Sequence, residues 1–301
     1  MSCSSPSATK NIRATLFLLD ASKSNLKSVE SREQQLRERL KSSFSKNEAI
    51  YFDFIRSNLS KQIILPLVSM QTIVNVEDLI LSDINNERRQ DEAREEISNL
   101  WSNAVSSSSP IVDCIENSAS NLELNTVLGG QAAVEIAQNI CVSSEKTRQT
   151  LSNIKIIGSG GSIENGFIGS DIEGAFTRGL DKLESEARNL MNIENLDVKV
   201  RSTVVISSDM MQRDSNGRRI LDLIINKTEE EIDQYLSERS QISEFSYFRP
   251  IVKIDGWLST KRNFSEEERI VLETYWRKWF LNRNLDEPDF GLGVIDWSVE
   301  Q

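Results

Sequence analysis

Residues 12–24 read IRATLFLLDASKS, an apolar run that stops at Asp20 and is followed by Ser22 and Ser24. A short and nearly continuous apolar run of this kind is typical of a strand that is buried in a parallel sheet. In open α/β sheets, ligands bind outside the carboxyl ends of the strands. The stretch therefore predicts a buried strand that ends at a ligand-binding edge and places one carboxylate and two hydroxyls there.

Further along the chain, short apolar runs alternate with segments of helical periodicity. The runs that predict strands are 49–55, 202–207, 249–257 and, more weakly, NIKII at 153–157. The segments that predict helices are 28–44, 171–191 and 265–281, the last opening with the capping box Ser265 and Glu268. This alternation predicts an α/β fold with a mostly parallel central sheet flanked by helices.

The middle of the chain interrupts this alternation. Residues 60–150 are mostly polar and helical in pattern, so we interpret them as a large helical insertion. The strands on both sides of it are expected to form one sheet, which makes residues 11–301 a single domain. Residues 1–10 lack the apolar core of a signal peptide and are expected to be a disordered lead-in.

The composition excludes several classes of function. Asp and Glu number 46 against 35 Lys and Arg, the formal net charge is −11, and there is no histidine. Nucleic-acid binding needs clustered Lys and Arg, so we expect no nucleic-acid partner. The lack of histidine removes Ser-His and Cys-His catalysis and the commonest zinc ligand. No apolar run approaches the roughly 18 residues of a membrane span, so no membrane association is expected.

The cysteines bear on the compartment. They are Cys3, Cys114 and Cys141, an odd number at wide spacing without a Cys-x-x-Cys pair. This pattern predicts no disulfide framework and a reducing, cytoplasmic environment.

Oxygen ligands follow the ends of three predicted elements. Asp20, Ser22 and Ser24 follow the first strand, Asp209 follows the strand at 202–207, and Ser170 precedes the helix at 171. Mg²⁺ prefers six oxygen ligands, keeps some waters and takes one or two carboxylates. The five residues therefore predict a Mg²⁺ site, which Mn²⁺ or Ca²⁺ can also occupy, at the carboxyl edge of the sheet.

The same segments resemble a von Willebrand factor A domain with a metal-ion-dependent adhesion site, of the bacterial intracellular type. The family's Asp-x-Ser-x-Ser motif stands here as DASKS. Its second motif is similar to FIGSDIEGAF, in which Ser170 stands where the family has threonine. Its third is similar to VVISSDMM, in which Asp209 is retained and Met210 stands where the family has glycine. The resemblance covers residues 10–56 and 153–283 and implies a Rossmann-like fold.

The resemblance also implies a function. The chain would be a non-enzymatic adaptor whose Mg²⁺ accepts a carboxylate from a partner protein, while the helical insertion contributes further contacts. Among bacterial intracellular proteins of this type, the resemblance implies a role in defence or mobile-element systems.

Other interpretations of these residues stay open. DASKS can form a turn that caps the next helix, and either Ser170 or Asp171 can cap the helix that begins near 171. The glycine-rich stretch GSGGS at 158–162 is interpreted as a flexible loop because it lacks the Gly-Lys-Ser/Thr ending of a phosphate-binding loop.

Two other functions compete with the adaptor. One is a Mg²⁺-dependent phosphatase or nuclease that uses the same acidic residues. The other is a scaffold in which the site is vestigial. The adaptor predicts metal-dependent binding, the hydrolase predicts turnover, and the scaffold predicts neither.

Overall fold

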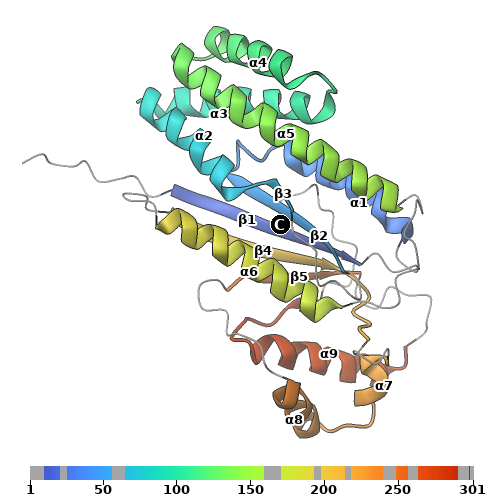
Figure 1. The fold of residues 1–301 in the computed structure, drawn as a ribbon. Coiled ribbons are helices and arrows are strands. Elements are labelled where there is room, and N and C mark those ends of the chain that lie inside the picture. Colours follow the sequence, from blue (N-terminus) through green and yellow to red (C-terminus); the bar gives the residue numbers. More distant parts are fainter. Residues whose placement is uncertain are drawn as a thin grey trace, which may run out of the picture.

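The computed structural model describes residues 10–20, 26–55, 65–158, 171–192, 198–213, 218–239, 249–256, 264–290 and 298. A six-stranded sheet in the order β3-β2-β1-β4-β5-β6 forms the centre of the fold (Figure 1). Its strands are β1 (Lys10–Asp20), β2 (Glu48–Ile55), β3 (Leu65–Val68), β4 (Val198–Ser207), β5 (Ile251–Asp255) and β6 (Asp289–Phe290). All neighbouring pairs are parallel except β2 and β3, which are antiparallel.

Helices flank this sheet and gather beyond both of its edges. They are α1 (Leu26–Lys41), α2 (Met70–Asp83), α3 (Glu87–Ser106), α4 (Ile111–Asn125), α5 (Gly130–Gly158), α6 (Ile172–Met191), α7 (Ile220–Ile224), α8 (Glu229–Arg239) and α9 (Glu266–Leu281). Figure 1 shows α2–α5 together beyond the β3 edge and α7–α9 beyond the opposite edge. The predicted α/β class and the mostly parallel sheet are therefore confirmed.

The predicted helical insertion at 60–150 corresponds to a longer helical stretch, α2–α6, between β3 and β4. Two details differ from the prediction. Residues 65–68 form the short edge strand β3, and residues 153–157, predicted as a weak strand, belong to the last turns of α5. The β-branched residues of NIKII continue the helical periodicity of α5, and Leu151 and Ile154 are buried on it, so tertiary packing overrides their strand propensity.

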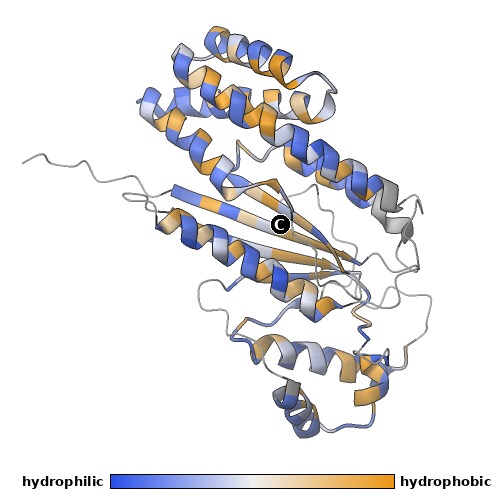
Figure 2. Ribbon diagram, viewed as in Figure 1, coloured by the Kyte–Doolittle hydropathy of each residue, from blue (hydrophilic) through white to orange (hydrophobic). Residues whose placement is uncertain are grey.

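The core forms where the sheet meets the apolar faces of the helices. β1 has a run of buried residues from Ala14 to Asp20, and Figure 2 shows the strand changing from hydrophilic at its start to hydrophobic further along. On α6, six apolar residues at helical spacing are buried: Ile172, Phe176, Leu180, Leu183, Ala187 and Leu190. Helix α6 packs on β1, β2 and β4.

Helix α9 packs against α6 with aromatic side chains. Its predicted capping box is present: Ser265 accepts from the Glu268 backbone N–H, and the Glu268 side chain accepts from the Ser265 N–H. Trp276 and Trp279 are buried, and the Phe176 ring of α6 stands edge-on to Trp279. Both tryptophans are therefore core residues.

The cysteine spacing predicted no disulfide framework, and the one disulfide of the described residues was missed. Cys114 of α4 and Cys141 of α5 are bonded, with their Cα atoms 6.0 Å apart. The two residues are 27 positions apart, and only the packing of α4 on α5 brings them together. Cys3 and the predicted disordered residues 1–9 lie outside the described residues. Within the described ranges, no helix is both long enough and apolar enough to span a membrane.

Candidate functional site

The candidate site lies where the strand order reverses. The chain runs from β1 to β2 on one side and reaches β4 on the other side of β1. In sheets of this order the connections leave in opposite directions, and the crevice between them outside the carboxyl ends is the usual ligand site. Asp20 is the last residue of β1, one position beyond the pair Leu19 and Ser207. Asp209 follows the end of β4 by two residues.

The structure therefore brings the two predicted carboxylates to one edge of the sheet. The side chain of Asp20 is 0% exposed and that of Asp209 is 6% exposed. A buried charge requires hydrogen bonds or a counter-charge, since its transfer from water costs several kcal/mol.

Ser208 connects the two segments. Its hydroxyl donates to Asp20 Oδ2 over 3.0 Å and accepts from the Met210 backbone N–H over 3.0 Å. Its own N–H donates to the Asp255 carbonyl over 3.0 Å. Asp209 Oδ1 accepts from the Met211 N–H over 3.0 Å. This network fixes the β4 loop against β1 and orients both carboxylates. The sequence places Ser208 here, but its role as a link was missed because it depends on a partner 188 positions away.

Met210 adopts the left-handed conformation, with φ of 60°. Glycine adopts this conformation without a steric penalty. The von Willebrand factor A family, which the sequence resembles, has glycine at this position. Here Met210 is fully buried, and its carbonyl accepts a hydrogen bond from Trp276 Nε1 over 3.1 Å. Packing and this hydrogen bond therefore hold the strained backbone in place after Asp209.

The surroundings of Asp209 disfavour its ionised form. Burial, which is the larger cause, and the negative charge of Asp20 raise the pKa of Asp209 to about 6, against the hydrogen bond from Met211. A bound cation would reverse both effects, because it favours the ionised carboxylate. The two buried carboxylates are oxygen donors of the kind that Mg²⁺ takes.

The remaining predicted ligands cannot be placed. Ser22, Ser24 and Ser170 lie outside the described residues, as do residues 159–162 of the glycine-rich stretch. Asp171 is described and is the N-cap of α6, where its Oδ1 accepts from the Gly174 N–H over 2.9 Å. A side chain at Gly174 would collide with the Asp171 carboxylate. Among the described residues, there is no group of three or more Asp, Glu or Cys that could hold a metal ion, so the predicted site depends on its hydroxyl ligands.

A third strand-end carboxylate, Asp255, is neutralised within the protein. It is 0% exposed and forms a salt bridge with Arg32 of α1, which is 3% exposed. The chain bends directly after Asp255, at Gly256 with φ of 81°. The ion pair was not predicted, because Arg32 belongs to the charged pattern of α1 and nothing local distinguishes it from solvated arginines.

Helix α6 begins beside the same edge. The Glu173 N–H donates to Gln212 Oε1 over 2.9 Å, and Tyr275 of α9 donates to the Glu173 carboxylate. These contacts tie the start of α6 to the β4 loop. The described start of α6 therefore lies at the edge that carries Asp20 and Asp209. Comparison of the whole chain with protein-family models, curated proteins and solved structures finds no match.

Proposed function

We propose that the chain is a metal-dependent protein-interaction module. The observation that carries the proposal is the pair of buried carboxylates, Asp20 and Asp209, at the crevice where the strand order reverses. The raised pKa of Asp209 supports it, since it reports a negative site that a cation would stabilise.

In this proposal Asp20 and Asp209 supply the negative charge, and Ser22, Ser24 and Ser170 supply neutral oxygens. A divalent ion held by two carboxylates and hydroxyls accepts a further anionic oxygen readily. The resemblance to the von Willebrand factor A family implies that a partner's Asp or Glu provides it. The role of Ser208 is to position Asp20 through its hydrogen bond.

The Mg²⁺-dependent phosphatase or nuclease is the competing function. It needs a group that activates water or attacks the phosphorus, and a cation that neutralises the phosphate. Among the described residues, Arg32 of α1 lies near this edge and is engaged by Asp255. This engagement supports binding over turnover.

The experiment that tests the proposal is capture of partners from the native host with the immobilised chain. The arms are wild type in Mg²⁺, wild type in EDTA, Asp20→Asn in Mg²⁺ and Asp91→Asn in Mg²⁺. Asp91 is the matched control, because its side chain is 77% exposed on α3 and the substitution removes the same charge. We expect a partner to be captured in Mg²⁺ by wild type and by Asp91→Asn, and in neither of the other two arms.

A partner retained in all four arms would contradict the metal bridge. Hydrolysis of para-nitrophenyl phosphate or of a single-stranded oligonucleotide that requires Mg²⁺ and is lost in Asp20→Asn would establish the hydrolase instead.

A further inference from the structure

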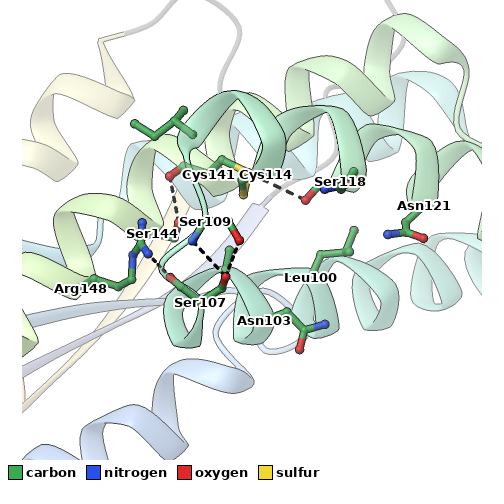
Figure 3. Close-up of a pocket in the computed structure, with 13 residues that line it drawn as sticks. Leu100, Asn103, Ser107, Ser109, Cys114, Ser118, Asn121, Cys141, Ser144 and Arg148 are labelled. Carbon is green, nitrogen blue, oxygen red and sulfur yellow. Dashed lines mark hydrogen bonds between the residues drawn. A yellow bond between two sulfur atoms is a disulfide. The ribbon is translucent and has the colours of Figure 1, made fainter.

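A disulfide lines a cavity among the helices, far from the sheet edge in the fold. The cavity has a volume of about 160 Å³ and lies between α3, α4 and α5. Its lining includes both cysteines, Ser118, Ser107 and Arg148 (Figure 3). Cys141 is 1% exposed, whereas Cys114 is partly exposed. The cavity therefore gives a small thiol a route to the bond from the Cys114 side.

Helix α4 packs on α5 and α3 but buries few of its own side chains. Of its 15 residues it buries three, Ser118, Ala119 and Leu122. Its N-cap is Pro110, which makes no side-chain capping hydrogen bond. Three of its apolar residues face solvent: Ile111 is 38% exposed, Val112 is 64% exposed and Leu124 is 81% exposed. A helix with so little buried apolar surface belongs to the low-stability end of a structure, where local opening occurs.

We propose that Cys114–Cys141 is a thiol–disulfide exchange site whose reduction releases α4 from α3 and α5. The reductant is a dithiol. Its thiolate attacks Cys114 Sγ, the S–S bond breaks, and Cys141 leaves as a thiolate that takes up a proton. The second thiol of the dithiol then closes its own disulfide and releases Cys114 as a thiol. Two electrons pass from the dithiol to the protein.

The surroundings of Cys141 favour its departure. The Ser118 hydroxyl lies 3.8 Å from Cys141 Sγ (Figure 3) and can donate a hydrogen bond to the thiolate. A hydrogen bond to the charged form lowers the pKa of a thiol. A lower pKa of the leaving thiol speeds exchange. In the cytoplasm, disulfides are usually transient and redox-sensing, so this chemistry is compatible with the predicted location.

The test is hydrogen exchange of the full chain in its oxidised form and after dithiothreitol, with thiols counted by mass spectrometry after alkylation. We expect native protein to gain two thiols at Cys114 and Cys141. Amide exchange should become at least about tenfold faster across residues 111–125 and stay unchanged across β4 (198–207). The variant Cys114→Ser should exchange like reduced protein, and Cys3→Ser like oxidised protein.

A second measurement tests the exchange chemistry separately from folding. The rate of reduction by dithiothreitol should fall severalfold in Ser118→Ala and not in Ser120→Ala, whose hydroxyl donates to the Glu116 carbonyl instead. The proposal is overturned by a bond that resists dithiothreitol until the chain unfolds, or by thiols that stay free in oxidised glutathione. Reduction that leaves α4 exchange unchanged, or that accelerates exchange across the whole sheet, would overturn it equally.

Discussion

At the scale of single residues, the burial of Asp209 lowers the stability of the metal-free protein and favours a bound cation. Asp209 is buried beside Asp20, and its pKa is raised to about 6 from an ordinary value of 3.8. In the unfolded chain the carboxyl ionises at the lower pH. The raised pKa therefore lowers the free energy of unfolding of the metal-free protein. This loss is absent below about pH 4 and complete above about pH 6. A cation would remove this loss.

The first prediction concerns this loss. Asp209→Asn keeps an oxygen that can accept from the Met211 N–H and loses the charge. In EDTA at pH 7 it should raise the free energy of unfolding by roughly 2 to 3 kcal/mol, since one pKa unit corresponds to about 1.4 kcal/mol. Near pH 4 the gain should disappear. Urea unfolding at the two pH values measures it, and an equal gain at both would contradict the account.

The second prediction concerns the buried pair Arg32–Asp255. Asp255→Asn leaves the Arg32 guanidinium buried without its counter-charge, which should lower the free energy of unfolding by about 3 to 5 kcal/mol. The double variant Arg32→Met with Asp255→Asn should recover most of this loss. The control is Asp91→Asn, which breaks an exposed pair with Arg94 and should cost less than about 1 kcal/mol. If the free-energy changes of the two single substitutions simply add in the double variant, the two side chains are not coupled.

The sequence allowed the charged ends of the strands to be predicted but not their pairing. Asp20 and Asp209 were identifiable because each follows a buried apolar run, which is a local signal. The hydrogen bond from Ser208 to Asp20 and the ion pair of Arg32 with Asp255 join residues far apart in the chain. Such pairings depend on strand order, which no local pattern encodes.

At the scale of elements, α9 supports the loop that carries Asp209. Its Trp276 donates to the carbonyl of Met210, the residue next to Asp209. Helix α6 starts at the same loop through Glu173 and Gln212. Both helices were predictable from their apolar spacing and, for α9, from its capping box. The short strands β3 and β6 were not, because two to four residues carry too little pattern.

The third prediction separates the support of the loop from aromatic packing in general. Trp276→Phe leaves the buried Met210 carbonyl without its donor and should cost about 1 to 3 kcal/mol beyond the loss of packing. It should also weaken Mn²⁺ binding, because the loop holding Asp209 loosens. The matched control is Trp279→Phe, since Trp279 Nε1 has no hydrogen-bond partner within the described part of the chain. Equal effects of both substitutions on Mn²⁺ affinity would show that α9 does not position the loop.

At the scale of the whole molecule, the strand order brings the site residues together, and the net charge determines how strongly the surface attracts ions in general. The order β3-β2-β1-β4-β5-β6 places β1 and β4 side by side, so residues 188 positions apart share one crevice. The α/β class followed from the alternation of strands and helices, and the order of the strands did not. A net charge of −11 attracts divalent ions to the surface in general. Specific binding must therefore be measured at physiological salt against a charge-matched control.

The central claim is that Asp20 and Asp209 hold a divalent cation, and calorimetric titration with Mn²⁺ at 0.15 M salt tests it most directly. The proteins are wild type, Asp20→Asn, Asp209→Asn and Asp91→Asn, each first shown to be folded. We predict one saturable site in wild type and Asp91→Asn, and an affinity at least about tenfold lower in the two site variants. Identical titrations of all four proteins would contradict the account.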